Sequence, residues 1–424
     1  PHQTRNTARL LTAVREPAMR IHLGLLKRAL RTVHAHPHAR LLQHRAGAGG
    51  QIKTGSLLAG HRMHLRNQLG GFGAHRLGHL VAATADARTQ PGGNFLRAKL
   101  THPLHGLLEH AIEQAAAAVV AELRRTGAFD RAVILIAAST GSGWVDEWQV
   151  QPLEFLTRGN CATASLQYSY VPSVLNWLTG LEPAQDASAA LFAAVRAELD
   201  LMDEASRPAL FVCGESLGAF ASQSVFSSVD DALTQVDGAL WVGTPAFTPM
   251  HEALTAARHT GSPEVAPVVN NGRRVRFVNE PSDLRTDLYG RELGPWGFPR
   301  IVYAQHPSDP VVWWNNKLIW TQPDWLRERA GRDVSRDVEF TRFATYIQIL
   351  ADLPVAGTAP GGHGPTYHEE LIPLWRAILG FDRLFDEAPV HPRLAALDGS
   401  WVADAMVERI GLVVRANLEL SDRQ

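Results

Sequence analysis

The sequence is poor in cysteine and contains no long apolar run. Its two cysteines, Cys161 and Cys213, are too few for a disulfide framework or a four-cysteine zinc site. Cys213 ends an apolar run, which favours a buried hydrophobic role. No run reaches the ~18 apolar residues of a membrane-spanning helix, and no secretory signal is evident. As the chain stands, we expect it to be cytoplasmic and to lack a transmembrane segment.

Acidic residues are almost absent from the first quarter of the chain. Residues 1–108 hold 16 Lys and Arg against two acids, Glu16 and Asp86, so this segment carries +14 and the remainder −15. Three interpretations compete: a basic arm for nucleic acid or an anionic membrane, a disordered extension, and a stretch that is not a selected protein sequence. Charge bias alone is weak evidence for a partner. A disordered or atypical segment is therefore favoured, and no nucleic-acid partner is expected.

Histidine is skewed in the same direction, with 13 of 19 falling within residues 1–110. His34, His36 and His38 alternate along the chain, which suits a strand rather than one face of a helix. No cysteine or carboxylate accompanies them. We therefore predict no metal site, and nothing in the sequence calls for a cofactor.

Residues 109–424 have a different character and are predicted to form one catalytic domain. Their apolar segments alternate between continuous runs, typical of buried parallel strands, and runs with helical spacing. Strands are predicted at 132–138, 163–171, 209–214, 238–243, 275–279 and 300–305, and helices at 108–123, 186–202, 217–229, 340–355, 368–379 and 402–414. This alternation predicts an α/β fold with a mainly parallel sheet and helices on both faces.

The stretch "GESLG" at 214–218 lies between a predicted strand and a predicted helix. G-x-S-x-G in that context is the pattern of a nucleophile elbow, in which small residues permit a sharp turn that exposes the serine. The helix that follows would favour developing negative charge at its start. Ser216 is therefore the predicted nucleophile, and a simple glycine-flanked turn is the alternative.

A serine hydroxyl needs a base, commonly a histidine that is oriented by a carboxylate. In this kind of fold the three residues follow in the chain order Ser, acid, His. His363 lies between two glycines in a predicted loop, as a mobile base would, and is preferred. His368 is the alternative base, although it begins a predicted helix, and His306 is expected to line the pocket.

Asp309 is the preferred acid, because it follows an apolar strand and precedes Pro310, which stiffens the turn. Asp283, in "NEPSDL" after another predicted strand, is the alternative.

An acyl-transfer site also needs N–H donors for the oxyanion. One is expected from Leu217, the residue after the nucleophile. The second is expected from the turn "STGSG", where Ser139 and Thr140 follow an earlier strand and Gly143 permits close approach of the backbone. A flexible loop is the alternative, and a phosphate cradle is disfavoured because no Lys follows in the P-loop pattern.

Four tryptophans, at 313, 314, 320 and 325, come after the last predicted strand. They are expected to pack in a core or lid, and the alternative is that they wall an apolar pocket for an acyl group.

Several longer motifs resemble one known family. They are "AASTGSGWVDEWQVQPLEFL", "LQYSYVPSVLNWL", "GESLGAFASQSVF", "DGALWVGTP", "QHPSDPVVWW" and "ADLPVAGTAPGGHGPTY". Together, over roughly residues 109–380, they resemble an actinobacterial α/β-hydrolase family whose members usually carry a multi-span membrane region before the catalytic domain. The resemblance implies an α/β-hydrolase fold with Ser216 as nucleophile, and it carries over Asp309 in "HPSDP" and His363 in "GGHG". It also implies contact with a membrane, whereas this chain has a basic, His-rich segment where the membrane spans would be.

These observations predict a serine hydrolase that cleaves a carboxylic ester or a related small acyl substrate through a Ser216–His363–Asp309 triad. An acyltransferase would use the same residues with an alcohol as acceptor. A catalytically silent, membrane-associated binding protein that keeps the fold is a third possibility, although the complete Ser–Asp–His order argues against it.

Overall fold

The computed structural model describes residues 102–140, 143–169, 181–353, 359–382, 385, 389 and 391–422. All of them fall within one compact unit of the chain. Residues 1–101, with His34, His36 and His38, lie outside the described residues. The described chain begins with helix α4 (His102–Arg125), which starts earlier than the predicted helix. No group of three or more metal-ligating side chains occurs among the described residues, and none of their helices is long and apolar enough to cross a bilayer.

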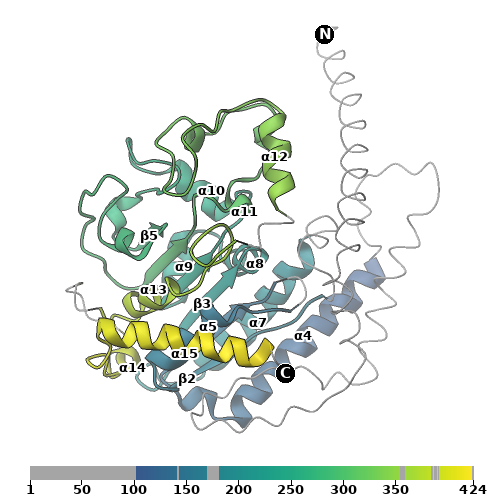
Figure 1. Ribbon diagram of the computed structural model, residues 1–424. Coiled ribbons are helices and arrows are strands. Elements are labelled where there is room, and N and C mark those ends of the chain that lie inside the picture. The colour runs from purple at the N-terminus through teal and green to yellow at the C-terminus, as the bar shows by residue number, and fades with distance from the viewer. Residues whose placement is uncertain are drawn as a thin grey trace. The chain divides into compact units, whose positions relative to one another are not determined.

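A parallel sheet organises the described part of the chain (Figure 1). Its six strands follow the order β2-β1-β3-β4-β6-β5, and every neighbouring pair is parallel. The strands are β1 (Val133–Ala138), β2 (Cys161–Ala164), β3 (Ala209–Glu215), β4 (Gly238–Val242), β5 (Val275–Val278) and β6 (Arg300–Ala304). Their continuous apolar sequences are explained by burial on both faces. The predicted mainly parallel sheet is thus confirmed.

Two apolar cores, one on each face of the sheet, hold the helices in place. The first core joins alternate strand residues such as Leu135 and Phe211 to α5 (Glu147–Leu156), α13 (Leu371–Ile378) and α15 (Asp404–Asp422). Figure 1 shows α5 and α15 in front of the sheet. Because successive side chains of a strand point to opposite faces, the same strands also supply the second core.

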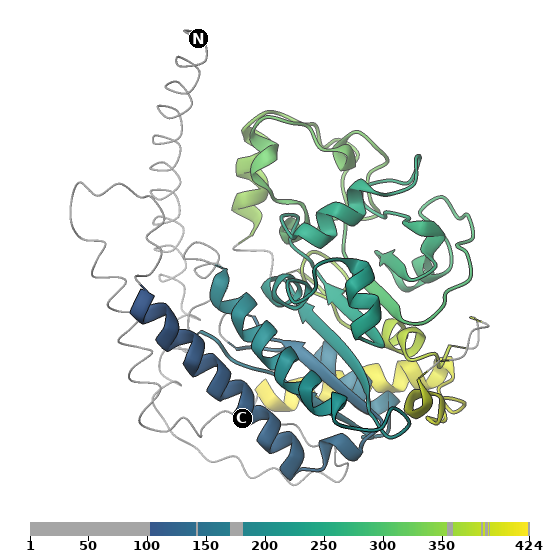
Figure 2. The same ribbon diagram turned by 180° about the vertical axis from the view of Figure 1, so that it is seen from behind.

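The second core covers the opposite face, which is turned to the viewer in Figure 2. Strand residues such as Ile134 and Val212 pack there against helices from five segments of the chain. These helices are α4, α7 (Glu182–Asp200), α8 (Leu217–Gln223), α9 (Val229–Gln235) and α10 (Pro249–Ala256). The prediction of helices on both faces is confirmed.

The strand order brings the last strand inside the sheet. β5 lies at the edge, and the chain then returns so that β6 pairs with β4. The turn after β6 consequently lies beside the end of β4, which itself adjoins β3. The end of β6 is therefore two strand spacings, about 10 Å, from the end of β3.

Several elements differ from the predictions. The predicted strand 163–171 is β2, which begins at Cys161 and ends at Ala164, where its pairing with β1 stops. The predicted helix 217–229 is α8, which ends at Gln223; a separate helix, α9, begins at Val229, where the hydroxyl of Ser228 accepts the N–H of Asp231 as its N-cap. The helices α5 and α10 were not predicted, and Pro152 inside α5 masks the helical pattern there.

A long segment connects β4 to α13. Besides α10, β5 and β6, it consists mostly of short helical turns, and its apolar side chains form a third cluster. The segments α11 (Pro310–Trp313) and α12 (Ala344–Asp352) contribute to this cluster, which contains Val265, Val312, Trp313, Trp314, Leu318, Trp325 and Tyr346. Three of the four tryptophans are therefore packed in a core of their own, whereas Trp320 is 65% exposed.

Candidate active site

The turn after β3 has the geometry of a nucleophile elbow. β3 ends at Glu215, Ser216 adopts φ +52° and ψ −119°, and α8 begins at the next residue. Such a conformation costs a non-glycine residue on the order of 1–3 kcal/mol and persists only where the surroundings enforce it. The strand, the serine and the helix therefore occur in the predicted order, with the backbone strain located at the serine.

The two flanking glycines are explained by close backbone contacts. A Cβ on Gly214 would lie 2.4 Å from the carbonyl group of Gly218, and a Cβ on Gly218 would lie 2.4 Å from the carbonyl oxygen of Ala138 in β1. Real Cβ atoms do not approach backbone so closely. Any larger residue would push α8 away from the sheet, so the motif is a steric requirement of this turn.

Ser216 lies at the carboxyl edge of the sheet and is half-buried. Its N–H donates to the carbonyl of Val242 at the end of β4 (3.0 Å), and its side chain does not cap α8. Leu217 is the first residue of α8, where a backbone N–H has no acceptor within the helix. The predicted first oxyanion donor thus stands directly beside the serine.

The turn "STGSG" after β1 meets this prediction only in part. Ser139 adjoins the elbow, since the Cβ position of Gly218 is 3.5 Å from its carbonyl carbon, and its hydroxyl donates to the carbonyl of Leu166 (2.9 Å). The N–H of Thr140 already donates to the carbonyl of Trp144 (2.8 Å). Thr140 therefore contributes no free backbone donor in this conformation, and Gly141 lies outside the described residues.

Asp309 follows β6 and is fully buried. Its Oδ1 accepts the N–H of Val311 (2.9 Å), and its Oδ2 accepts the hydroxyl of Tyr367 (2.9 Å). The same Oδ2 lies 3.0 Å from the Cβ position of Gly243, the residue after β4. Burial raises the pKa of this carboxyl to about 6. Asp309 thus lies at the expected edge of the sheet, but both of its oxygens are bonded to groups other than a histidine.

His363 lies on an exposed loop whose backbone is attached to the turn after β6. The carbonyl of Gly364 accepts a hydrogen bond from Nδ1 of His306 (2.7 Å), and the N–H of Gly364 donates to the hydroxyl of Ser308 (2.9 Å). The imidazole of His363 has its Nδ1 3.3 Å from Oδ2 of Asp333. The structure therefore brings His363 to Asp333, and no hydrogen bond between described residues joins it to Asp309.

The two alternative histidines are occupied in other ways. Both ring nitrogens of His306 have partners, since Nδ1 donates to the carbonyl of Gly364 and Nε2 lies 3.3 Å from Oε1 of Glu370. Its ring also stacks on Tyr367, with centroids 4.0 Å apart. His368 stacks on Trp148 at 5.1 Å. Neither ring is arranged as a mobile base.

The alternative acid, Asp283, stabilises a backbone turn. Its Oδ2 accepts the N–H groups of Asn279 (2.8 Å) and Glu280 (3.1 Å). Glu280 accepts in return from the Asp283 backbone, which makes a capping box at the end of β5. The carboxylate of Asp283 is consequently committed to local structure.

Buried carboxyl groups gather behind the elbow. Burial raises the pKa of Glu215 well above its usual range, and the charges of Asp146 and Asp309 raise it further. Burial likewise raises the pKa of Asp146 to about 7. Glu215 also accepts a hydrogen bond from Gln149 (3.2 Å). The protein environment thus resists full ionisation of this group of acids at neutral pH.

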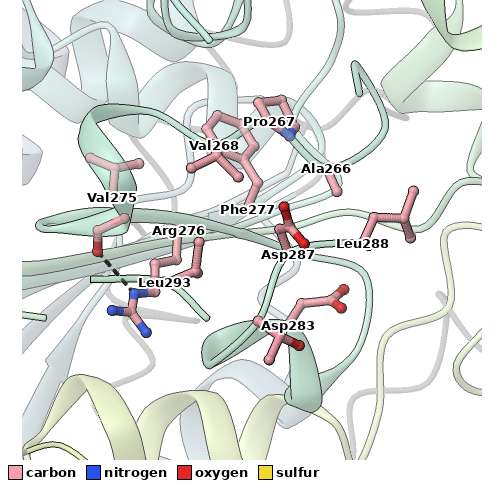
Figure 3. A pocket seen from close by; sticks show the side chains of 12 residues that line it. Ala266, Pro267, Val268, Val275, Arg276, Phe277, Asp283, Asp287, Leu288 and Leu293 are labelled. Carbon is pink, nitrogen blue, oxygen red and sulfur yellow. Dashed lines mark hydrogen bonds between the residues drawn. The ribbon is translucent and has the colours of Figure 1, made fainter. Parts of the chain in front are cut away.

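A small pocket lies elsewhere, against the edge strand β5 (Figure 3). Its wall includes Phe277, Asp287 and the buried Arg276, whose guanidinium donates to the carbonyls of Gly272 (2.9 Å) and Gly294 (2.6 Å). It has room for about one water molecule. Its size and its place at the sheet edge separate it from the Ser216 site.

Three comparisons with known proteins bear on the identity of the chain. A solved structure, "Trichoderma reesei cutinase in complex with a C11Y4 phosphonate inhibitor", is similar at 13% identity over 41% of this chain and 77% of that chain, with a TM-score of 0.21, which is too weak to carry an argument. A search of curated proteins finds no match. A family model described as "Alpha/beta-hydrolase family" matches residues 105–389. The match confirms the predicted fold family, and the chain belongs to this alpha/beta-hydrolase family.

Proposed function

We propose that the protein is a serine hydrolase that cleaves an uncharged carboxylic ester, or a related acyl compound, through an acyl-enzyme at Ser216. The observation that carries this proposal is the strained conformation of Ser216 between two glycines that cannot be enlarged. A turn with only a structural role would not require backbone strain at its serine. For a nucleophile, the same conformation exposes the hydroxyl and places it at the start of a helix.

In the proposed reaction, Ser216 Oγ attacks the carbonyl carbon while Nε2 of His363 takes the hydroxyl proton. The carbonyl oxygen becomes an oxyanion, which the N–H of Leu217 stabilises together with a second donor from the Ser139 turn. Collapse of the tetrahedral intermediate breaks the ester bond, and the imidazolium gives its proton to the departing alcohol. Water, activated by the same imidazole, then releases the carboxylic acid and restores Ser216.

The geometry supports His363 as the base because its Nδ1 faces a carboxylate. A proton held on Nδ1 would leave Nε2 as the nitrogen that accepts the serine proton. The loop of His363 is hydrogen-bonded to the turn after β6, and the end of β6 is two strand spacings, about 10 Å, from the end of β3. Either Asp309, the acid favoured by the sequence, or Asp333, which faces the imidazole, would complete the triad.

The charge around the site supports an uncharged substrate. Glu215 immediately precedes Ser216, and Asp309 and Asp146 interact with it electrostatically. Whatever fraction of this acidic group is ionised would repel an anionic ester such as a phosphate, and no Lys or Arg among the described residues acts on Glu215 to balance that charge. A neutral carboxylic ester has no such penalty until its oxyanion forms, and that charge faces the backbone N–H groups.

The direct test is labelling with a fluorophosphonate probe, combined with hydrolysis of a series of p-nitrophenyl esters of increasing acyl length. We expect the wild type to be labelled and active, and Ser216→Ala to lose both. Ser224→Ala is the matched control, because its hydroxyl only bonds back to the carbonyl of Ala221 within the same turn of chain.

Product analysis in the presence of an added alcohol separates hydrolysis from transfer to that alcohol. A folded wild type that takes up no label and turns over no ester would refute the proposal.

A further inference from the structure

We propose that Asp333, and not Asp309, is the positioning residue that orients the base His363. This inference rests on the proposed function. The carboxylate of Asp333 is mostly buried, with its side chain 17% exposed, and its Oδ2 lies 3.3 Å from Nδ1 of His363. Ser216, Asp333 and His363 also keep the chain order of nucleophile, acid and base.

Asp333 is held at its place by a hydrogen bond to the turn after β6. The hydroxyl of Ser308 donates to the same Oδ2 of Asp333 that faces the imidazole. Ser308 in turn accepts the N–H of Gly364, the residue after His363. The base, its acid and the backbone of the histidine loop are thus joined in one closed ring of contacts through a single serine.

The second oxygen of Asp333 is also informative. Oδ1 is buried and has no hydrogen-bond partner in the described part of the chain. A buried carboxylate oxygen without a partner is costly. A small rotation of the carboxyl group or of the imidazole would let it share the Nδ1–H, and such tightening of a catalytic hydrogen bond is common when substrate binds.

Asp309 performs a different task in the same region. Its oxygens are taken by Val311 at the start of α11 and by Tyr367, whose hydroxyl also accepts the N–H of His306 (3.0 Å). Asp309 therefore fastens the segment around Tyr367 to the turn after β6. Its loss would loosen the support of the histidine loop without removing a charge from beside the imidazole.

The test compares Asp333→Asn with Asp309→Asn in the full chain, using an ester that the wild type hydrolyses. A carboxylate at Nδ1 fixes the tautomer and stabilises the imidazolium, and its replacement by an amide in a well-studied triad costs on the order of 10,000-fold in kcat. We expect Asp333→Asn to lose at least about 100-fold in kcat with little change in KM. Loss of the anion should also move the ascending limb of the pH profile to lower pH.

Asp333→Glu restores the carboxylate and should recover part of kcat and the wild-type position of the pH limb. Ser308→Ala should lower kcat by about 10-fold, because Asp333 then loses its support. If Asp333→Asn does not fold, the kcat and the pH profile of Ser308→Ala test the assignment in its place. Asp309→Asn should lower the unfolding temperature and leave the pH limb in place.

The assignment is wrong if folded Asp333→Asn and Ser308→Ala keep wild-type kcat and pH profile. It is equally wrong if Asp309→Asn alone moves the pH limb. Fluorophosphonate labelling of Ser216 distinguishes these outcomes from failure of the proposed function: an unlabelled, inactive wild type would refute the hydrolase itself, whereas a labelled, active wild type with an unaffected Asp333→Asn would refute only the role of Asp333.

Discussion

The two halves of the candidate site are held in contrasting ways. Ser216 is fixed by backbone contacts between β1, β3 and α8, at the carboxyl end of β3, an interior strand whose side chains belong to both cores. His363 lies on a loop with its side chain 55% exposed, and its position depends on a few side-chain hydrogen bonds. The comparison teaches that the proposed nucleophile is positioned by the fold itself, whereas the proposed base is positioned by a loop.

The largest effect expected from this comparison is that of Gly218→Ala. The added methyl group would meet the carbonyl oxygen of Ala138 at 2.4 Å, and neither backbone can yield without separating α8 from β1. We expect a loss of about 3 kcal/mol or more in the free energy of unfolding. Ester hydrolysis should fall by on the order of 100-fold even in the folded fraction, because Ser216 is displaced. Chemical unfolding and ester kinetics measure the two effects.

Gly411→Ala is the matched control for steric strain. Gly411 is a glycine of α15 whose Cβ position is 3.2 Å from Cγ of Glu369, a flexible side chain. We expect this change to be neutral or slightly stabilising, since alanine favours a helix. Equal stability of Gly218→Ala and wild type would contradict the packing of the elbow described above.

The next effect concerns the pH dependence of stability near the elbow. The pKa of Asp146 is about 7 in the folded protein and near 4 in an unfolded chain, so the folded state holds the extra proton between these values. The stability that the folded state gains from holding this proton is fully present below about pH 4 and is lost as the pH rises through about 7.

Asp146→Asn removes this titration and still caps α5, because asparagine is a good N-cap residue. We expect the variant to exceed the wild type by roughly 1–3 kcal/mol at pH 8 and to differ little from it at pH 4. Urea unfolding at the two pH values measures the difference. An equal gain at both pH values would show that ionisation of Asp146 is not the cause.

The same contrast explains how much of the fold the sequence predicts. The sequence predicts five of the strands to within a residue or so, namely β1, β3, β4, β5 and β6. Strands that are buried on both faces have continuous apolar sequences, which are easy to recognise. The short β2 was misplaced, since four residues of Cys, Ala and Thr give little signal. The helix α5 was missed because Pro152 lies inside it, where tertiary packing overrides propensity.

The residues of the candidate site also differ in how well the sequence predicts them. Ser216 and its glycines could be predicted because a local steric requirement fixes the residues next to one another in sequence. The contact of His363 with Asp333 joins residues 30 positions apart in the chain, with α12 between them, and "GRDVSRD" carries no periodic or turn pattern that singles out its first aspartate. Asp309 as the acid of a triad stays a prediction from the sequence, and the contact of His363 with Asp333 is a feature that sequence patterns do not reveal.

The smallest effect is expected in the loop, from Gly362→Ala. Gly362 has φ +81°, but no atom lies within 4 Å of its Cβ position, so only backbone strain opposes the substitution. We expect a cost of about 1 kcal/mol in stability. The contacts of Gly364 with His306 and Ser308 still hold the loop, so kcat/KM should stay within about threefold of the wild type, a change of less than 1 kcal/mol. Thermal unfolding and ester kinetics of Gly362→Ala and Gly218→Ala, measured side by side, would rank the two regions. If the loop variant lost as much activity as the elbow variant, His363 would have to be held as rigidly as Ser216, and the contrast between a fold-fixed nucleophile and a loop-borne base would fail.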